Sequence, residues 1–130
     1  MNRPNFLPLT GVRILTFENF GAGPFGSMYL ADLGAEVIKI ENRAQGGDAT
    51  RRMGPYFLGS EDSHFFQTFN LNKKSVALNL KTTDGQAIFR KLVAKSDAVL
   101  NNLRGDQPEK LGLTYEALKA SNPKIVCAHL

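Results

Sequence analysis

The sequence of 130 residues contains no tryptophan, one cysteine and two histidines. The single cysteine, Cys127, excludes an intrachain disulfide and is typical of proteins from a reducing compartment. Residues 1–10 contain two prolines and no apolar run long enough for a signal peptide. We therefore expect a cytoplasmic protein without a membrane partner.

The sequence also lacks several patterns that would point to catalysis or to nucleic-acid binding. His64 has no serine, cysteine or aspartate at a spacing that suggests a catalytic triad. No stretch reads as a basic recognition helix, a set of zinc ligands or an aromatic RNA-binding signature. We therefore predict neither a metal site nor a nucleic-acid partner.

Positive charge is in excess, with a formal net charge of +4. The cations gather in or beside one central segment, and they are Arg43, Arg51, Arg52, Lys73 and Lys74. Clustered cations favour a ligand that carries phosphate groups.

Alternating strand and helix patterns predict an α/β fold, and the length and ordinary composition suit a single domain over residues 1–130. Strands are expected at residues 12–17, 36–40, 75–80, 97–100 and 124–128. Helices are expected at residues 24–33, 84–95, 107–111 and 115–120. Strand–helix–strand units of this kind build a Rossmann-like open parallel sheet with helices on both faces.

Each of the two longer helices has an apolar side that we expect to face the core. In the first helix these residues are Phe25, Met28, Tyr29 and Leu33. In the second they are Ile88, Phe89, Leu92 and Val93. Residues 42–72, between the two units, show neither a helical nor a strand period, and we expect them to form a long functional or mobile loop.

One glycine pattern points to a dinucleotide. Gly21, Gly23 and Gly26 have the spacing of the NAD fingerprint, and Glu41 lies near the distance expected for the acid that holds a ribose hydroxyl. However, three residues separate the strand from Gly21, and the next strand leads into a loop of about 30 residues, not directly into a helix. An NAD-dependent oxidoreductase domain therefore stays an alternative.

Three segments together point to a different ligand: residues 9–15, residues 22–25 and residues 30–41. They resemble the start of the family III CoA-transferases, which include formyl-CoA transferase and the carnitine CoA-transferases. The resemblance runs from about residue 9 to residue 129 and covers only the N-terminal part of that family. It therefore implies that the ligand is coenzyme A, and it leads us to expect that the sequence is a fragment or a truncated copy of a longer protein.

The resemblance also implies which residues contact CoA. Phe20, Gly21 and Ala22 match the segment beside the pantetheine arm, and Asn42 and Arg43 match the region of the adenine and 3′-phosphate. The segment from Asn70 to Lys81 resembles N-x-x-K-[RK]-S-[VI]-x-L-[DN]-[LM]-K, which implies contacts from Leu71 and Lys74. Residues 100–105 resemble E-N-F-R-P-G, and the remaining implied contacts are Asn102, Leu103, Arg104 and Lys110. Leu103 departs from the family's phenylalanine and cannot stack on adenine as an aromatic ring would.

The resemblance implies the reaction as well. In the family an aspartate attacks the thioester of an acyl-CoA donor, forms a mixed anhydride, is converted by the released thiolate to an enzyme–CoA thioester, and passes CoA to a carboxylic acid. That aspartate would lie beyond residue 130, so we predict no catalytic residue in this chain and no activity of the chain alone. The family also implies a homodimer. Alternatives are a relative of the acyl-CoA racemases and a non-catalytic CoA-binding remnant.

Overall fold

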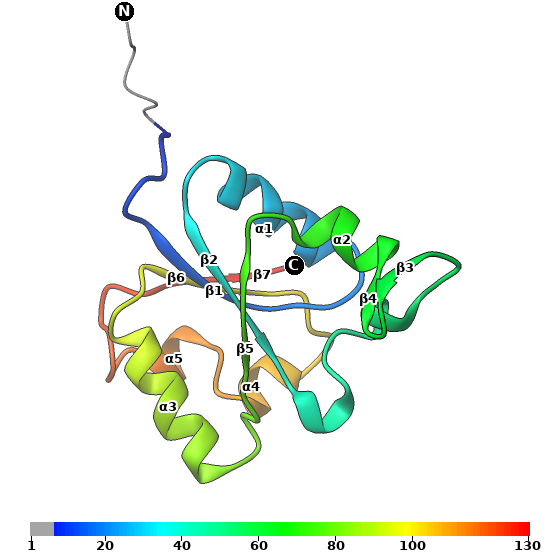
Figure 1. The fold of residues 1–130 in the computed structure, drawn as a ribbon. Helices are drawn as coiled ribbons and strands as arrows, with labels where there is room; N and C mark the ends of the chain where they lie inside the picture. The colour runs from blue at the N-terminus through cyan, green and yellow to red at the C-terminus, as the bar shows by residue number, and fades with distance from the viewer. Residues whose placement is uncertain (1–6) are drawn as a thin grey trace, which may run out of the picture.

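A computed structural model describes residues 7–130, and its centre is one five-stranded parallel sheet (Figure 1). The strands are β1 (Arg13–Phe17), β2 (Glu36–Glu41), β5 (Lys74–Ala77), β6 (Ala98–Asn101) and β7 (Val126–His129). They lie in the order β5-β2-β1-β6-β7. The three central strands are almost wholly buried because helices cover both faces of the sheet. The predicted α/β fold with a Rossmann-like parallel sheet is confirmed.

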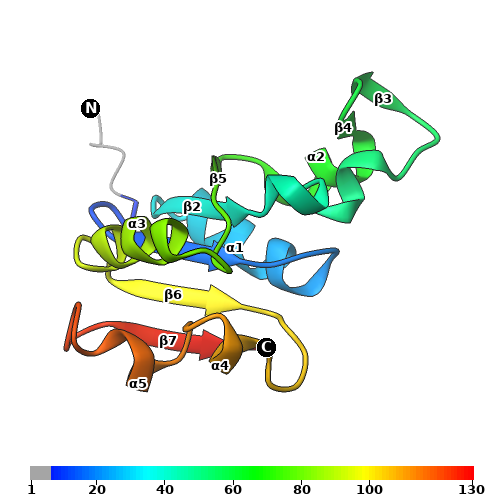
Figure 2. The ribbon, with the colours of Figure 1, turned by 90° about the horizontal axis from the view of Figure 1, so that it is seen from below.

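The two faces of the sheet have separate apolar clusters. On one face, α1 (Ala22–Asp32) packs Ala31 against Ile14 and Val37. On the other, α3 (Thr83–Val93) contributes Phe89 and Val93 to a larger cluster. The short helices α4 (Gln107–Lys110) and α5 (Tyr115–Leu118) lie beside β6 and β7, as Figure 2 shows, and Leu118 joins the larger cluster.

The predicted inward side of α1 is wrong. Its buried residues are Gly23, Pro24, Ser27 and Ala31, whereas Phe25, Tyr29 and Leu33 are exposed and Met28 is half-buried. Small residues let the helix approach the sheet closely, and the larger aromatic rings turn outward toward the next helix along the chain. There Phe25 meets Tyr29 and Phe69 edge-to-face, with ring centroids 4.9 and 5.9 Å apart.

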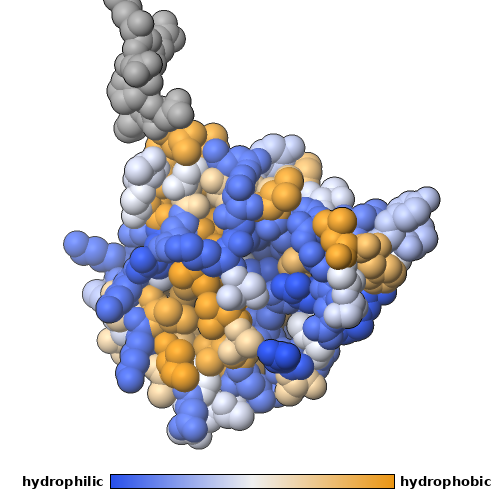
Figure 3. Space-filling view, in the orientation of Figure 1, coloured by the Kyte–Doolittle hydropathy of each residue, from blue (hydrophilic) through white to orange (hydrophobic). Residues whose placement is uncertain are grey.

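The predicted side of α3 is right in three positions of four, because Leu92 also packs against the cluster of Phe89 and Val93. Phe89 and Val93 are buried, Leu92 is partly buried, and Ile88 is 46% exposed. On the face seen in Figure 3, apolar side chains gather at the lower left, beside α3.

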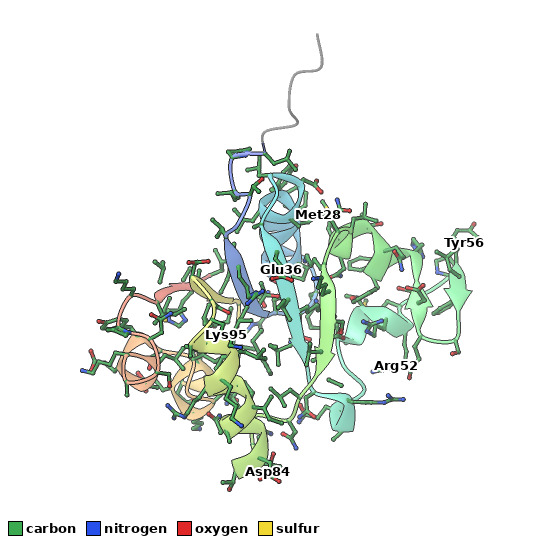
Figure 4. The ribbon with its side chains drawn as sticks, turned by 60° about the vertical axis from the view of Figure 1, so that its left-hand side comes forward. Met28, Glu36, Arg52, Tyr56, Asp84 and Lys95 are labelled. Carbon is green, nitrogen blue, oxygen red and sulfur yellow. The ribbon has the colours of Figure 1, made fainter. Side chains whose placement is uncertain are left out.

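Residues 42–72 are not one long loop. They form two 3₁₀ turns, η1 (Arg43–Gln45) and η2 (Ala49–Arg52), a small hairpin of β3 (Phe57–Gly59) and β4 (Asp62–Ser63), and helix α2 (His64–Asn70). Polar caps start these short elements: Asn42, Asp48 and Ser63 each accept a backbone N–H from the turn that follows. Figure 4 shows Tyr56 on the hairpin, far out from the sheet. Within residues 7–130 no helix is long and apolar enough to cross a membrane.

Candidate functional site

The topology places a cleft at the carboxyl ends of β1 and β6. From β1 the chain passes through α1 to β2 on one side, whereas from β6 it passes through α4 and α5 to β7 on the other. Loops that leave neighbouring strands in opposite directions open a crevice between them, and open α/β sheets bind ligands there. The crevice here is a cavity of ≈ 620 Å³, lined by Asn19, Phe20, Gly21, Ala22, Asn102, Leu103 and Arg104.

Six of the residues implied by the family resemblance therefore share one cleft. Phe20, Gly21 and Ala22 come from the turn after β1, and Asn102, Leu103 and Arg104 come from the turn after β6. The two turns lie about 80 residues apart in sequence, as the 83-residue separation of Asn19 and Asn102 shows, and the parallel pairing of β1 with β6 brings them together.

Asn102 joins the two turns through its side chain. Its Oδ1 accepts the backbone N–H of Asn19, and its Nδ2 donates to the Asn19 carbonyl, both at 2.9 Å. A β-carbon on Gly23 would lie 2.8 Å from Cγ of Asn102, so only glycine fits where α1 passes this amide. The amide of Asn102 is thus engaged with the protein backbone.

Phe20 is the most unusual residue of the cleft. Its φ of +64° lies in the left-handed region, which residues other than glycine seldom adopt. Its side chain is 54% exposed at the cleft. Strained backbone of this kind is typical of functional sites, where the surrounding contacts hold it in place.

The amino end of α1 opens into the same cleft. Its N-cap residue is Gly21, which offers no side-chain cap, and its first turn holds no acidic residue. Backbone N–H groups and the positive end of the helix dipole are therefore available to an anion. Arg104, on the opposite wall, forms no ion pair with another residue of the described range 7–130.

A second cavity of ≈ 180 Å³ shares Asn19 and Leu103 with the first cleft. Amide side chains dominate its polar lining, and Lys81 adds a charge. Its residues are Phe17, Asn19, Asn42, Gln45, Asn79, Leu80, Lys81, Leu103, Gln107 and Leu111. Several amides around apolar side chains can recognise a flat heterocycle with hydrogen-bond donors and acceptors.

The sequence predicted only Asn42 and Leu103 of these ten residues, and Asn79, Lys81 and Gln107 are among those that it missed. The signal for Asn79 and Lys81 was their place just after the strand of residues 74–77, at the carboxyl edge where ligands bind. Asn42, which the resemblance did imply, lies in the same cavity.

The structure does not bring Leu71 and Lys74 to this edge. Lys74 is the first residue of β5 and therefore lies toward the amino end of the sheet. Its Nζ is 2.5 Å from Oε1 of Glu36, the first residue of β2, which is labelled in Figure 4. Leu71 and Lys74 line a separate cavity beside α2. Arg43 lines another cavity, beside Glu41, and Lys110 pairs with Asp106 on the surface.

Glu41, the acid of the NAD-type pattern, is already engaged. Its two oxygens accept from Nε and Nη2 of Arg51 at 2.8 and 2.6 Å, and they also accept from Ser75 and from the backbone of Asp48. Burial raises the pKa of Glu41, but these hydrogen bonds outweigh it and bring the pKa to about 2. A carboxylate bound in this way has little capacity left for a ribose hydroxyl.

Neither histidine lines the two cavities. His64 lies on the hairpin side with Nδ1 near the Tyr56 carbonyl, and His129 contacts Asn101. No cluster of three potential metal ligands occurs among residues 7–130. The groups at the carboxyl edge can therefore bind phosphate, an apolar arm and a heterocycle, which is the chemistry of a nucleotide-derived carrier.

Comparisons with known proteins agree with this chemistry. The model of the family described as CoA-transferase family III matches residues 9–130. A succinate–glutarate CoA-transferase of Agrobacterium fabrum is 41% identical over 124 residues, which are 92% of this chain and 31% of that protein. A human succinyl-CoA:glutarate CoA-transferase is 43% identical over 94% of this chain and 27% of its own length.

The fold has a solved counterpart as well. The crystal structure of a CaiB/BaiF family protein from Brucella suis has a TM-score of 0.87 and 36% identity, and covers 96% of this chain and 33% of that protein. The chain thus spans about a third of the length of the relatives that it matches.

Proposed function

Because this chain belongs to CoA-transferase family III, we propose that it is the CoA-binding part of an enzyme that moves CoA from an acyl-CoA donor to a carboxylic acid. The observation that carries the proposal is the cleft after β1 and β6. Six residues implied by the family resemblance meet there, from two turns far apart in sequence. Nothing in their spacing along the chain requires that meeting, so their convergence supports a shared ligand.

The proposed arrangement uses both cavities. The pantetheine arm lies in the larger one, along Phe20 and the backbone of Gly21 and Ala22. A phosphate group is held by the free amino end of α1 together with Arg104. The adenine enters the amide-lined cavity, where Asn42 and Asn79 supply hydrogen bonds, Lys81 supplies charge and Leu103 supplies an apolar surface.

The reaction itself requires a group outside these residues. We propose that the nucleophile is an aspartate beyond residue 130, which attacks the donor thioester and expels CoA thiolate to form a mixed anhydride. The thiolate then attacks that anhydride and releases the donor acid, leaving CoA on the aspartyl carbonyl. The two curated relatives are named for succinate and glutarate, so short dicarboxylic acids are the first acceptors to test.

We further propose a homodimer in the cytoplasm. Exposed apolar residues support the assembly: Tyr56 and Leu58 on the hairpin, and Val126 on the edge strand β7. An uncovered strand edge and apolar tips of this kind fit a second copy of the same chain. A concentration-independent monomer in light scattering would contradict this part of the proposal.

Calorimetric titration with CoA and with NAD tests the ligand. We expect CoA to bind more tightly, because the cleft offers phosphate-binding groups and an apolar wall, whereas Glu41 is occupied by Arg51. The Arg104→Ala and Lys81→Ala variants should weaken CoA binding without a large change in melting temperature. Tighter binding of NAD than of CoA would overturn the proposal in favour of a dinucleotide domain.

A further inference from the structure

A second set of charges lies directly behind the cleft, and it is almost completely buried. Nζ of Lys73 is 2.9 Å from Oε1 of Glu18, and both side chains are at most 2% exposed. Nζ of Lys39 is 2.6 Å from Oδ2 of Asp48, and both are equally buried. Lys73 belongs to the cation cluster noted in the sequence, but none of these four residues is a CoA contact implied by the family resemblance.

The two ion pairs are joined into one chain of contacts. Oδ1 of Asn70, at the end of α2, accepts from Lys39 at 3.0 Å and from Lys73 at 3.2 Å. On the other side, Oδ1 of Asp48 accepts the backbone N–H of Phe20 at 3.4 Å. Since Glu18 and Phe20 are two residues apart, the contacts close into a ring that begins and ends at the turn after β1.

This ring completes the attachment of the turn. Glu18 is held by Lys73 and by the hydroxyl of Ser27 at 2.7 Å. The backbone of Asn19 is held by Asn102, and that of Phe20 by Asp48. Each of the three residues that lead to the cleft therefore has its own partner, and the left-handed conformation of Phe20 lies between fixed points.

The ring is costly, which argues that it has a purpose other than stability. Buried ion pairs seldom stabilise a fold more than apolar residues of the same size would, because both charges lose their hydration. Burial lowers the pKa of Lys73 for the same reason. The second oxygen of Glu18 is buried without any hydrogen-bond partner among residues 7–130. Unsatisfied buried groups of this kind are rare and need an explanation.

We propose that the Glu18–Lys73 pair is a positioning device for the CoA cleft, which fixes the turn at residues 18–20 in its ligand-binding shape. Lys73 also donates to the Pro24 carbonyl at 2.8 Å and so ties the first turn of α1 to the same point. Lys73 thus acts through Glu18 and α1, without contact with the ligand. The inference rests on the proposed function for the identity of the ligand only.

The test compares two double variants. Glu18→Gln/Lys73→Met removes both charges of the pair, so no buried charge is left unpaired. A single Lys73→Met variant, in contrast, would leave the Glu18 carboxylate buried without its cation. The matched control is Glu116→Gln/Lys119→Met, which makes the same two types of change at an exposed ion pair on α5. Both proteins are studied well below their melting temperatures, by titration with CoA and by amide hydrogen exchange.

In the Glu18/Lys73 variant we expect the Kd for CoA to rise about tenfold or more, with faster exchange at the Asn19 and Phe20 amides and unchanged exchange in β1 and β2. The control should leave the Kd and these amides as they are. A folded Glu18/Lys73 variant with wild-type affinity and wild-type exchange at residues 18–20 would overturn the inference. If the wild type itself does not bind CoA, the proposed function fails, and the exchange experiment still decides whether the pair fixes the turn.

Discussion

The three glycines of the dinucleotide-like pattern should respond very differently to alanine. In Gly23→Ala the new Cβ would lie 2.8 Å from Cγ of Asn102 and 2.9 Å from Cβ of Glu18. Both atoms lie close to the backbone and belong to side chains that are held by other contacts. Overpacking of this kind costs about 1–3 kcal/mol. It should also push α1 away from the turn after β6 and weaken CoA binding.

Gly21 and Gly26 are the matched controls. A Cβ at either position would meet nothing within 4 Å, and neither residue has a positive φ. Gly26 lies inside α1, so Gly26→Ala should stabilise the protein by roughly 0.5–1 kcal/mol through helix propensity. Gly21→Ala should leave the free energy of unfolding nearly unchanged.

Urea unfolding of the three variants gives the free energies directly, and CoA titration gives the affinities. We expect Gly26→Ala to be the most stable protein and Gly23→Ala the least stable. The wild type and Gly21→Ala should lie between them, with nearly equal free energies of unfolding. A true dinucleotide fingerprint needs the first glycine for its tight turn. If Gly21→Ala is the most destabilised variant, our interpretation of this turn is wrong.

Two further predictions concern single groups. The pKa of Glu41 is lowered from 4.5 to about 2 in the folded protein, so this carboxylate stabilises the fold fully above pH 4.5 and its contribution is lost as the pH falls toward 2. In the Glu41→Gln variant the free energy of unfolding should therefore fall less steeply between pH 4.5 and pH 2 than in the wild type. An equally steep fall would contradict the assignment. Burial raises the pKa of the Cys127 thiol, so Cys127 should react with a thiol reagent at pH 8 more slowly than free cysteine does. Reaction as fast as that of free cysteine would contradict this prediction and would show that β7 opens readily.

The strands and their parallel pairing could be predicted from the sequence because each central strand is a short apolar run between turn residues. The side of α1 that faces the sheet was not, because hydrophobicity alone favours burial of Phe25 and Tyr29. In the structure Ser27 is buried instead, since its hydroxyl reaches Glu18, and the aromatic rings pack toward α2. The buried Glu18 carboxylate thus explains why a serine, and not an aromatic residue, faces inward on α1.

The candidate site also has parts that the sequence predicts and parts that only the structure shows. The turns at residues 20–22 and 102–104 follow from strand ends and from the family resemblance together, and the structure brings them into one cleft. Lys74 stands in a recognisable segment, but it begins a strand and therefore lies toward the other end of the sheet, away from the cleft, so its contact with CoA stays a prediction. The Glu18–Lys73 contact spans 55 residues, and no local pattern marks which of two adjacent lysines turns inward.

The acids behind the cleft lead to a last prediction, that this chain alone carries out no CoA transfer. A carboxylate that attacks a thioester must be free to approach it, yet Glu18, Asp48 and Glu41 are each bound to a buried or half-buried cation. Without a nucleophile a covalent relay loses several orders of magnitude in rate. The assay mixes the purified 130-residue protein with succinyl-CoA and glutarate, follows glutaryl-CoA formation, and searches for trapped CoA adducts by mass spectrometry. We expect CoA to bind without turnover. A stable adduct on any acid of this chain would place the nucleophile within these residues and refute the division of binding and chemistry proposed above.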